Sequence, residues 1–355
     1  MNLKTLDENI IKNLSIWLKI SPEKIKSLGE ILPAEPNSYY EGLLDLEILS
    51  QFEGNIRRFV HKIVKCLKEK DKYFVLDTLK KFRQLKRKGL IEISECRFVK
   101  LDKILREKLS IPPIDWNGKK AVICLSHDID SQPDYDFCPE IVKLNQKYNI
   151  KSNFNFLTDA GYNPEPEFLK KLKEGGFEIG LHGHTHDIAI GIRPEKRIKK
   201  ELTLAIEKLN TPIYGYRAPA FALTKRVLRV LKQLGLKYDS SIKSISCYGQ
   251  AVETFYPYRY PGIDIWELPL TIQDDRIFRD LHLSCEEGLG VIKEITKRII
   301  DAGGVIVINN HPRLVQQKLY YYKELLKWIS SLDNVWVTTP IELINFMENR
   351  EKSIR

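Results

Sequence analysis

Three of the seven histidines in this 355-residue chain fall within five positions. They are His182, His184 and His186, and they follow a run, 177–181, whose alternating apolar residues predict a short strand. Neutral imidazole is a common ligand of zinc-like ions, so His182 and His186 can converge on one ion if the loop makes a helical turn. In that turn His184 points away from the ion, whereas in an extended chain it shares their side. We expect a metal site whose remaining ligands come from elsewhere in the chain.

A pair of acids, Asp128 and Asp130, is the first candidate for the missing groups. Acids separated by one residue point to the same side of an extended chain. One of them can then bind the metal while the other accepts a proton from water. The alternative is a pair of turn aspartates, since Asp is common in turns. Asp130, His182 and His186 would give two imidazoles, one carboxylate and open positions, which is the composition of a catalytic rather than a closed structural zinc site.

Two further residues follow predicted strands. Arg217 ends the run 213–216, where it can pair with a buried carboxylate and hold it ionised. It is equally compatible with a surface position. His311 comes soon after the apolar run 305–308. A histidine there serves either as a satisfied structural group or as a proton donor to a leaving group.

Predicted elements divide the chain into two parts. Residues 1–115 show mainly helical apolar spacing, with a small hairpin predicted over 91–99, and we expect a helical accessory domain. Breaker residues in 111–118 indicate a linker. From 116 to 355 strands and helices alternate, which favours an α/β fold with a parallel sheet closed as a (β/α) barrel. The expected strands lie at 121–125, 152–157, 177–181, 213–216, near 238, and at 265–268, 305–308 and 335–338. The expected helices lie at 138–148, 166–174, 195–209, 224–234, 286–300, 318–329 and 341–347. In such a barrel the functional groups gather at the carboxyl ends of the strands.

Composition is that of an ordinary soluble protein, with 43% hydrophobic and 29% charged residues. No apolar run reaches the length of a membrane span, and the acidic start of the chain does not fit a signal peptide, so we expect a cytoplasmic protein. The six cysteines are far apart and are expected to be free thiols. The net charge of +10 is diffuse apart from a cluster at 80–88, which is typical of a solvated helix face. Nucleic-acid binding is therefore not favoured.

Taken together, the motifs resemble those of the polysaccharide deacetylases, carbohydrate esterase family 4, with the NodB-homology fold. The resemblance covers about 119–345 and rests on four motifs in order: the acid pair, Glu-Ile-Gly-x-His-x-x-x-His, Arg-x-Pro, and a strand ending in His. It implies a distorted barrel of about seven strands and a divalent metal: zinc, or cobalt or manganese. It also implies roles for named residues: Asp128 the general base; Asp130, His182 and His186 the metal ligands; His311 the general acid; Arg217 the tether of Asp128; and Asp239 the residue that orients His311.

This resemblance implies a metal-dependent hydrolase that removes the acetyl group from an N-acetylated amino sugar or polysaccharide. Two departures bear on the substrate. The acids are separated by Ile129, a spacing associated with peptidoglycan-deacetylase-like proteins and allantoinase-like amidases. Ala220 stands where an aromatic normally follows Arg-x-Pro, with Phe221 next. Alternative readings are hydrolysis of a cyclic amide, a catalytically inactive glycan-binding module, and a metallo-β-lactamase-like hydrolase. The last is disfavoured because Asp187 follows His186, where that pattern places Asp before the last His.

Overall fold

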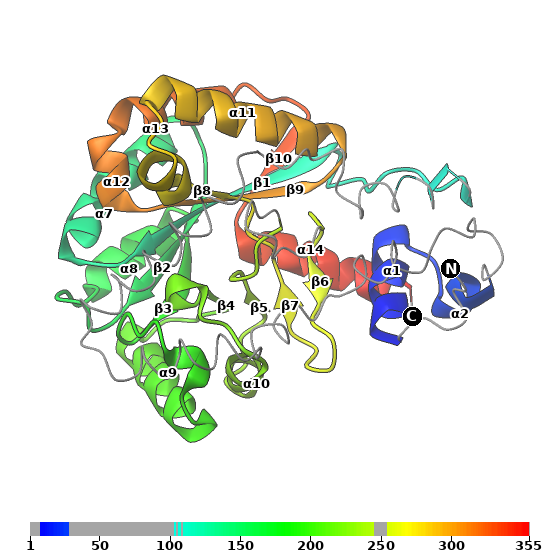
Figure 1. The fold of residues 1–355 in the computed structure, drawn as a ribbon, viewed down its shortest axis with the longest axis horizontal. Helices are drawn as coiled ribbons and strands as arrows, with labels where there is room; N and C mark the ends of the chain where they lie inside the picture. Colours follow the sequence, from blue (N-terminus) through cyan, green and yellow to red (C-terminus); the bar gives the residue numbers. More distant parts are fainter. Residues whose placement is uncertain (1–7, 28–102, 104–105, 108, 245–253, 355) are drawn as a thin grey trace.

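A computed structural model describes residues 8–27, 103, 106, 107, 109–244 and 254–354 (Figure 1). Within these residues ten strands form one curled sheet in the order β6-β7-β5-β4-β3-β2-β1-β9-β8, with β10 also paired to β1. Only β6 and β7 pair antiparallel; the other pairings are parallel. The strands are β1 (Ala121–Ile129), β2 (Ser152–Leu157), β3 (Glu178–Gly183), β4 (Gly215–Tyr216), β5 (Tyr238–Asp239), β6 (Tyr258–Arg259), β7 (Trp266–Glu267), β8 (Ile272–Gln273), β9 (Val305–Asn310) and β10 (Val335–Val337).

One continuous segment, 266–273, joins the two ends of this sheet. At its start β7 pairs with β5, and at its end β8 pairs with β9. Between them the backbone N–H of Leu270 donates to the Ile242 carbonyl (2.8 Å), and that of Thr271 donates to Val307 (3.0 Å). The sheet is therefore a distorted barrel, and the α/β barrel expected from the sequence is confirmed.

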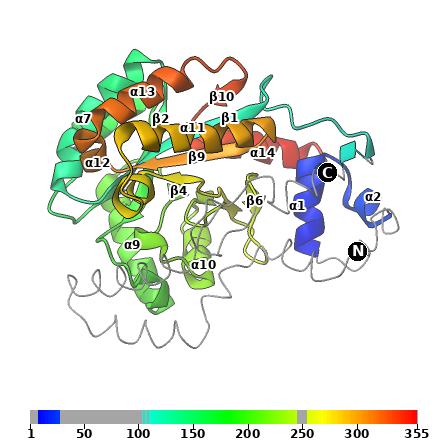
Figure 2. The same ribbon diagram turned by 45° about the horizontal axis from the view of Figure 1, so that its top comes forward.

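Helices pack around the outside of the barrel. In both views α11 and α13 lie on one side of the barrel, and α9 and α10 on the opposite side (Figures 1 and 2). Around the barrel the helices are α7 (Gln132–Lys147), α8 (Pro166–Glu174), α9 (Glu195–Leu209), α10 (Lys225–Gln233), α11 (Cys285–Asp301), α12 (Pro312–Gln317), α13 (Leu319–Ile329) and α14 (Pro340–Lys352). Two short 3₁₀ helices, η4 (Ile190–Ile192) and η5 (Pro219–Phe221), and one π-helical turn, η6 (Arg276–Asp280), lie between these elements.

The central strands are covered on both faces, which explains their apolar runs. Every residue of β1 and of β9 is buried, as expected for parallel barrel strands with helices on the outer face and the packed barrel interior on the other. Helix boundaries follow capping chemistry. Ser284 and Glu287 form a reciprocal capping box that starts α11 one residue before the predicted helix. The short helix α12 was not predicted, because it is a single stretch of six residues that directly follows β9 and His311.

Two N-terminal helices, α1 (Glu8–Leu18) and α2 (Pro22–Ser27), agree with the predicted helical character. α1 packs on the barrel beside α14 (Figure 1). The Trp17 indole donates to the Pro257 carbonyl (2.9 Å), and the Arg350 guanidinium donates to the Ile16 carbonyl (2.7 Å). The predictions for 28–102, including the hairpin and the basic cluster, lie outside the described residues. A domain boundary at 115 stays a prediction.

Glu178 at the start of β3 is a buried acid that makes stability depend on pH. Its carboxyl group accepts hydrogen bonds from the Tyr238 hydroxyl (2.6 Å) and the Ile341 amide (2.9 Å). Burial nevertheless raises the pKa of Glu178 to about 7 from an ordinary value of 4.5. Because the folded state binds this proton more tightly than the unfolded state, the contribution of Glu178 is most favourable below pH 4.5. It is lost as the pH rises toward 7.

We expect the variant Glu178→Gln to gain stability relative to the natural protein between about pH 5 and pH 8. Its amide resembles the protonated acid, with the oxygen facing Ile341 and the nitrogen facing Tyr238. Urea unfolding of both proteins at the two pH values measures the difference, since all other titrating groups are common to them. An unchanged difference between the two proteins would show that Glu178 is ionised when folded.

Candidate active site

The expected site residues lie at one edge of the barrel because each stands at the carboxyl end of a strand. Asp128 lies near the end of β1 and Asp130 directly follows it, His182 lies near the end of β3, Arg217 follows β4, and His311 follows β9. In a parallel sheet these ends meet on one side. Residues separated by up to 183 positions in the sequence are thereby brought together.

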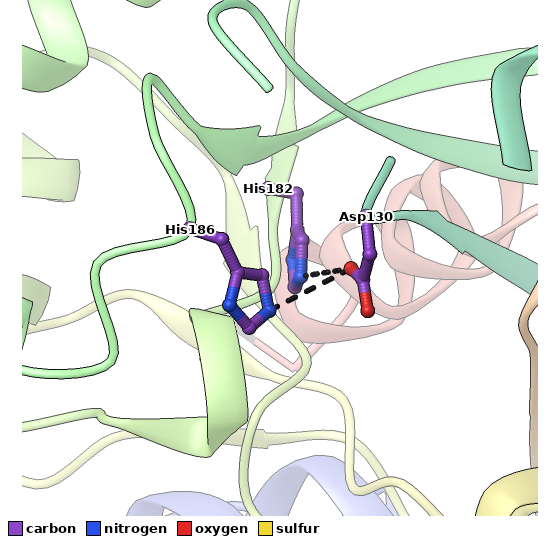
Figure 3. A group of neighbouring side chains, drawn as sticks. All are labelled: Asp130, His182 and His186. Atoms are coloured by element: carbon purple, nitrogen blue, oxygen red, sulfur yellow. Dashed lines mark ion pairs between the residues drawn. The ribbon is translucent and has the colours of Figure 1, made fainter. Parts of the chain in front are cut away.

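Asp130, His182 and His186 converge on one point (Figure 3). The Oδ1 atom of Asp130 lies 3.1 Å from His182 Nε2 and 3.6 Å from His186 Nε2. Potential ligand atoms of the three residues all lie within 4.8 Å of one another. The carboxylate projects from the end of β1, while the two imidazoles project from β3 and the loop that follows it.

Bonding around this cluster fits a divalent metal. His182 Nδ1 contacts the Arg217 carbonyl at 2.7 Å, which leaves Nε2 as the atom that faces Asp130. Asp130 Oδ1 is buried, and among the described residues no donor reaches it with hydrogen-bond geometry. Burial lowers the pKa of His186, which favours its neutral form. Burial also opposes protonation of His182, but Asp128 and Asp130 outweigh it and raise the pKa of His182. A metal ion would compete with that proton.

The loop after β3 points His184 away from this cluster. His184 Nδ1 lies 2.9 Å from the Thr158 hydroxyl, and its Nε2 lies 3.7 Å from Asp159. Just beyond, Asp187 is buried and paired with Arg193 (2.8 Å), and it accepts a hydrogen bond from the Ala189 amide. These contacts fix the turn that carries His186. The loop is neither extended nor a helical turn: residues 184 and 185 are bends after β3, and they separate His184 from the other two histidines.

Asp128 is a buried carboxylate held by three donors. Its Oδ1 accepts from Asn155 Nδ2 (2.8 Å) and Arg217 Nη1 (3.2 Å), and its Oδ2 accepts from Asn309 Nδ2 (2.7 Å). Burial alone would raise the pKa of Asp128, but the Arg217 charge, with those of His182 and His311, lowers it overall. Asp128 is therefore ionised at neutral pH and able to accept a proton.

Arg217 is buried, not on the surface, with 1% of the residue exposed. Besides Asp128, its guanidinium donates to the Ser240 carbonyl (2.8 Å), the Ser240 hydroxyl (2.9 Å), Ser126 Oγ (2.7 Å) and Asn309 Oδ1 (2.8 Å). Every nitrogen of its side chain thus has a partner. This network holds Arg217 in one orientation against Asp128.

Asp274, and not Asp239, orients His311. Both carboxylate oxygens of Asp274 contact this residue: Oδ1 lies 2.6 Å from His311 Nδ1, and Oδ2 accepts from the His311 amide (2.7 Å). The role that the family resemblance implied for Asp239 is wrong, because Asp239 is bonded to the amide and hydroxyl of Ser241 instead (2.8 Å each). The reason lies in the strand order, since β8, which Asp274 directly follows, pairs with β9, whereas β5 pairs with β4 and β7 and not with β9.

His311 presents its other nitrogen to the metal-binding cluster. Its Nε2 lies 3.8 Å from Asp130 Oδ2. The other carboxylate oxygen, Oδ1, is the one that faces His182 and His186. Burial would lower the pKa of His311, but the negative charge of Asp274 and its hydrogen bond raise it well above the ordinary value. Asp274, Asp275 and His311 also have the spacing of a metal cluster. The hydrogen bond between His311 Nδ1 and Asp274 accounts for the closeness of these side chains without an ion.

Replacing Asp274 with Asn should lower the pKa of His311, because the negative charge that stabilises the imidazolium is removed. If protonated His311 is needed for turnover, the alkaline limb of the profile of kcat/KM against pH should shift to lower pH. The variant Asp280→Asn, on the neighbouring turn η6, is the control. An alkaline limb at the same pH in Asp274→Asn and the natural protein would separate Asp274 from the protonation of His311.

The backbone shortly after Arg217 in the sequence is strained. Ala220 and Phe221 both have positive φ (48° and 57°), a conformation that side chains other than glycine rarely adopt. Strain of this kind at a loop between β4 and α10 is typical of functional sites. The displaced aromatic, Phe221, is half-buried, with the Lys243 ammonium 4.9 Å from its ring centroid.

Four residues of the site were not predicted from the sequence: Asn155, Asn309, Ser126 and Asp274. Each is a polar residue inside or directly after an apolar strand, and that position was the available signal. Asn309 interrupts the run of β9, and Asp274 follows β8 immediately. Their partners could not be assigned without the strand order.

Comparison with solved structures places this fold among known barrels. A Mycobacterium smegmatis protein provisionally assigned as a polysaccharide deacetylase is similar, with a TM-score of 0.57 and 20% identity over 67% of this chain and 94% of that one. The Puue allantoinase has a TM-score of 0.56 and 15% identity over 68% of this chain and 95% of that one. At these identities the likeness shows the fold alone.

Sequence comparison gives a family match. Residues 116–238 match the model of the family described as polysaccharide deacetylase. A peptidoglycan deacetylase of Helicobacter pylori is 26% identical over 107 residues, 29% of this chain and 36% of the relative. A peptidoglycan deacetylase-like protein of Gibberella zeae is 29% identical over 80 residues, 22% of this chain and 24% of the relative. The matches span about a third and a quarter of these relatives.

No described helix combines the length and apolar character needed to cross a bilayer.

Proposed function

We propose that the protein is a metal-dependent hydrolase that removes the acetyl group from an N-acetylated amino sugar within a polysaccharide or its fragments. The observation that carries this proposal is the convergence of Asp130, His182 and His186 beside an ionised Asp128 and a protonated His311. The match to the polysaccharide deacetylase family and the likeness to two peptidoglycan-deacetylase relatives support the reaction and the substrate class.

A divalent ion held by Asp130, His182 and His186 would supply Lewis-acid chemistry, polarising the amide carbonyl and acidifying an attacking water. We propose zinc, since two imidazoles and one carboxylate are a catalytic zinc donor set; cobalt or manganese are the alternatives. The other steps belong to the chain's own residues.

Asp128 accepts the proton of the attacking water, and Arg217 keeps Asp128 ionised and aimed at it. His311 donates a proton from Nε2 to the departing amine nitrogen as the C–N bond breaks. The products are acetate and a free amino sugar. Asp274 stabilises the charge of His311 and fixes its ring.

A second candidate reaction is the hydrolysis of a cyclic amide by the same residues. The spacing Asp128-Ile129-Asp130 favours it, and an allantoinase shares the fold. An inactive glycan-binding module is disfavoured because the ligands, base and acid are all present among the described residues.

The test is a substrate panel on protein stripped of metal and then loaded with zinc, cobalt or manganese in turn. We expect acetate release from N-acetylglucosamine oligomers or peptidoglycan fragments, with loss of release on chelation. Ring opening of a cyclic ureide without acetate release from any sugar would establish the second reaction instead. Metal binding with neither activity would leave a glycan-binding role.

A further inference from the structure

Two buried carboxyl groups lie on paired strands next to the segment that holds Arg217. Asp239 on β5 and Glu267 on β7 occupy paired positions of neighbouring parallel strands. Both residues are 0% exposed. Side chains at paired positions of adjacent strands lie on the same face of the sheet within contact distance. Two carboxylates so placed, away from water, repel each other strongly, and one proton between them removes the repulsion.

The donors around the pair indicate which residue holds this proton. Both oxygens of Asp239 accept hydrogen bonds, from the amide and the hydroxyl of Ser241 (2.8 Å each). Glu267 Oε1 accepts from the Ile242 amide (2.9 Å), whereas no described donor reaches the buried Oε2. A protonated Oε2 needs no donor, because it donates instead.

Charges around the pair agree with this assignment. Burial, with the neighbouring Asp239 charge, raises the pKa of Glu267 well above its usual value. Burial also raises the pKa of Asp239, opposed by its hydrogen bonds and by Arg217. Arg217 is a cation that acts on both groups. Burial and the Asp239 charge raise the pKa of the nearby Tyr216 hydroxyl, which is therefore neutral.

The pair is connected to Arg217 through two serines. The Ser241 hydroxyl donates to Asp239 and accepts from the amide of Ala218, the residue after Arg217 (2.8 Å each). Ser240 receives both Nε and Nη2 of the Arg217 guanidinium, and its hydroxyl donates to the Leu268 carbonyl next to Glu267 (2.8 Å). The backbone and the side chain of Arg217 therefore rest on the segments that carry the two acids.

We propose that Glu267 carries a proton, which it donates to the Asp239 carboxylate, and that the two acids are positioning residues that hold Arg217 against Asp128 through Ser240 and Ser241. Sharing a proton leaves the pair with a single negative charge. The single positive charge of Arg217 then lies between two negative charges, one on the pair and one on Asp128. A second negative charge beneath Arg217 would draw the guanidinium away from Asp128.

Infrared difference spectroscopy tests the proton without any assay of activity. We expect the C=O stretching band of a protonated carboxyl group at about pH 9, where Glu178, with its pKa of about 7, is ionised. This band should disappear in Glu267→Gln. In Asp239→Asn burial still favours the protonated acid but the repulsion from Asp239 is gone, so the band should be lost at a lower pH than in the natural protein. Its presence in Glu267→Gln, or its absence from the natural protein, would overturn the assignment of the proton.

The positioning role rests on the proposed function and is tested by comparing Glu267→Gln with Glu267→Leu. Gln retains a neutral donor toward Asp239 and an acceptor for Ile242, so we expect natural kcat and an unshifted acidic limb of the pH profile. Leu removes both, and kcat should fall about 10- to 100-fold with KM unchanged. Ser241→Ala, which cuts the connection to Ala218 and leaves both acids intact, should lower kcat in the same way.

Two measurements keep this test independent of folding and of the proposed reaction. Thermal unfolding and metal content identify any variant that fails to fold. The NMR resonance of Arg217 Nε reports its bonding even if no substrate is turned over, and it should move in Ser241→Ala and Glu267→Leu but not in Glu267→Gln. An unmoved resonance and natural kcat in Ser241→Ala would overturn the positioning role.

Discussion

Asp128→Asn should lower kcat by about 10²- to 10⁴-fold, the usual contribution of a general base, while the protein still binds its metal. The amide that replaces the carboxylate cannot accept a proton at neutral pH. Its oxygen can keep the bonds from Asn155 and Arg217, which both reach Oδ1. Its nitrogen then faces Asn309, which donates to Oδ2 in the natural protein, so a modest loss of stability accompanies the loss of turnover.

The control for this prediction is Asp136→Asn, an exposed aspartate on α7 whose carboxylate contacts only Gln132 among the bonds described. It should leave kcat, metal content and thermal stability unchanged. Acetate release from the purified, metal-loaded variants measures kcat, and elemental analysis measures the metal. Natural turnover by Asp128→Asn with a full complement of metal would remove Asp128 from the mechanism.

His182→Ala should abolish stable metal binding. This variant loses one of the three protein ligands. Removing only the hydrogen-bond partner of a ligand lowers metal affinity by roughly 10- to 100-fold, and losing the ligand itself should lower it further. His182 is also fixed by the Arg217 carbonyl, and its removal leaves Asp130 and His186 as the remaining members of the cluster. Calorimetric titration of the stripped protein with zinc measures the affinity.

His184→Ala is a matched control two residues away. It removes an imidazole of the same loop, but one that contacts Thr158 and Asp159 rather than Asp130. We expect its affinity for zinc to stay close to that of the natural protein. Equal losses in His182→Ala and His184→Ala would mean that the whole loop, and not His182 itself, determines binding.

Prediction from the sequence succeeded where local pattern and chemistry coincide. The apolar run before His182 and the long run before His311 define buried strands, and polar residues at strand ends meet in a parallel barrel whatever the order of the strands. This is why the convergence of Asp130, His182 and His186 could be expected. The same reasoning could not place His184, because its direction depends on the turn that Asp187 and Arg193 stabilise.

The sequence could not predict which side chains of neighbouring strands contact each other. Asp239 and Asp274 both follow or end short strands, and nothing local separates their roles. Only the order of the strands does so, since β8 lies beside β9 and brings Asp274 to His311. The identity of the donors to Asp128 has the same origin, because Asn155 and Asn309 reach it from the two strands that flank β1.

The segment 266–273 that joins the two ends of the sheet has a mechanical consequence. Glu267, near its start, is the residue proposed above to support Arg217 and, through it, Asp128, while Asp274, directly after its end, bonds to His311. Asp128 and His311 themselves stand on the directly paired strands β1 and β9. A shift of the segment along its own axis would therefore disturb the hydrogen-bond support of both residues at once.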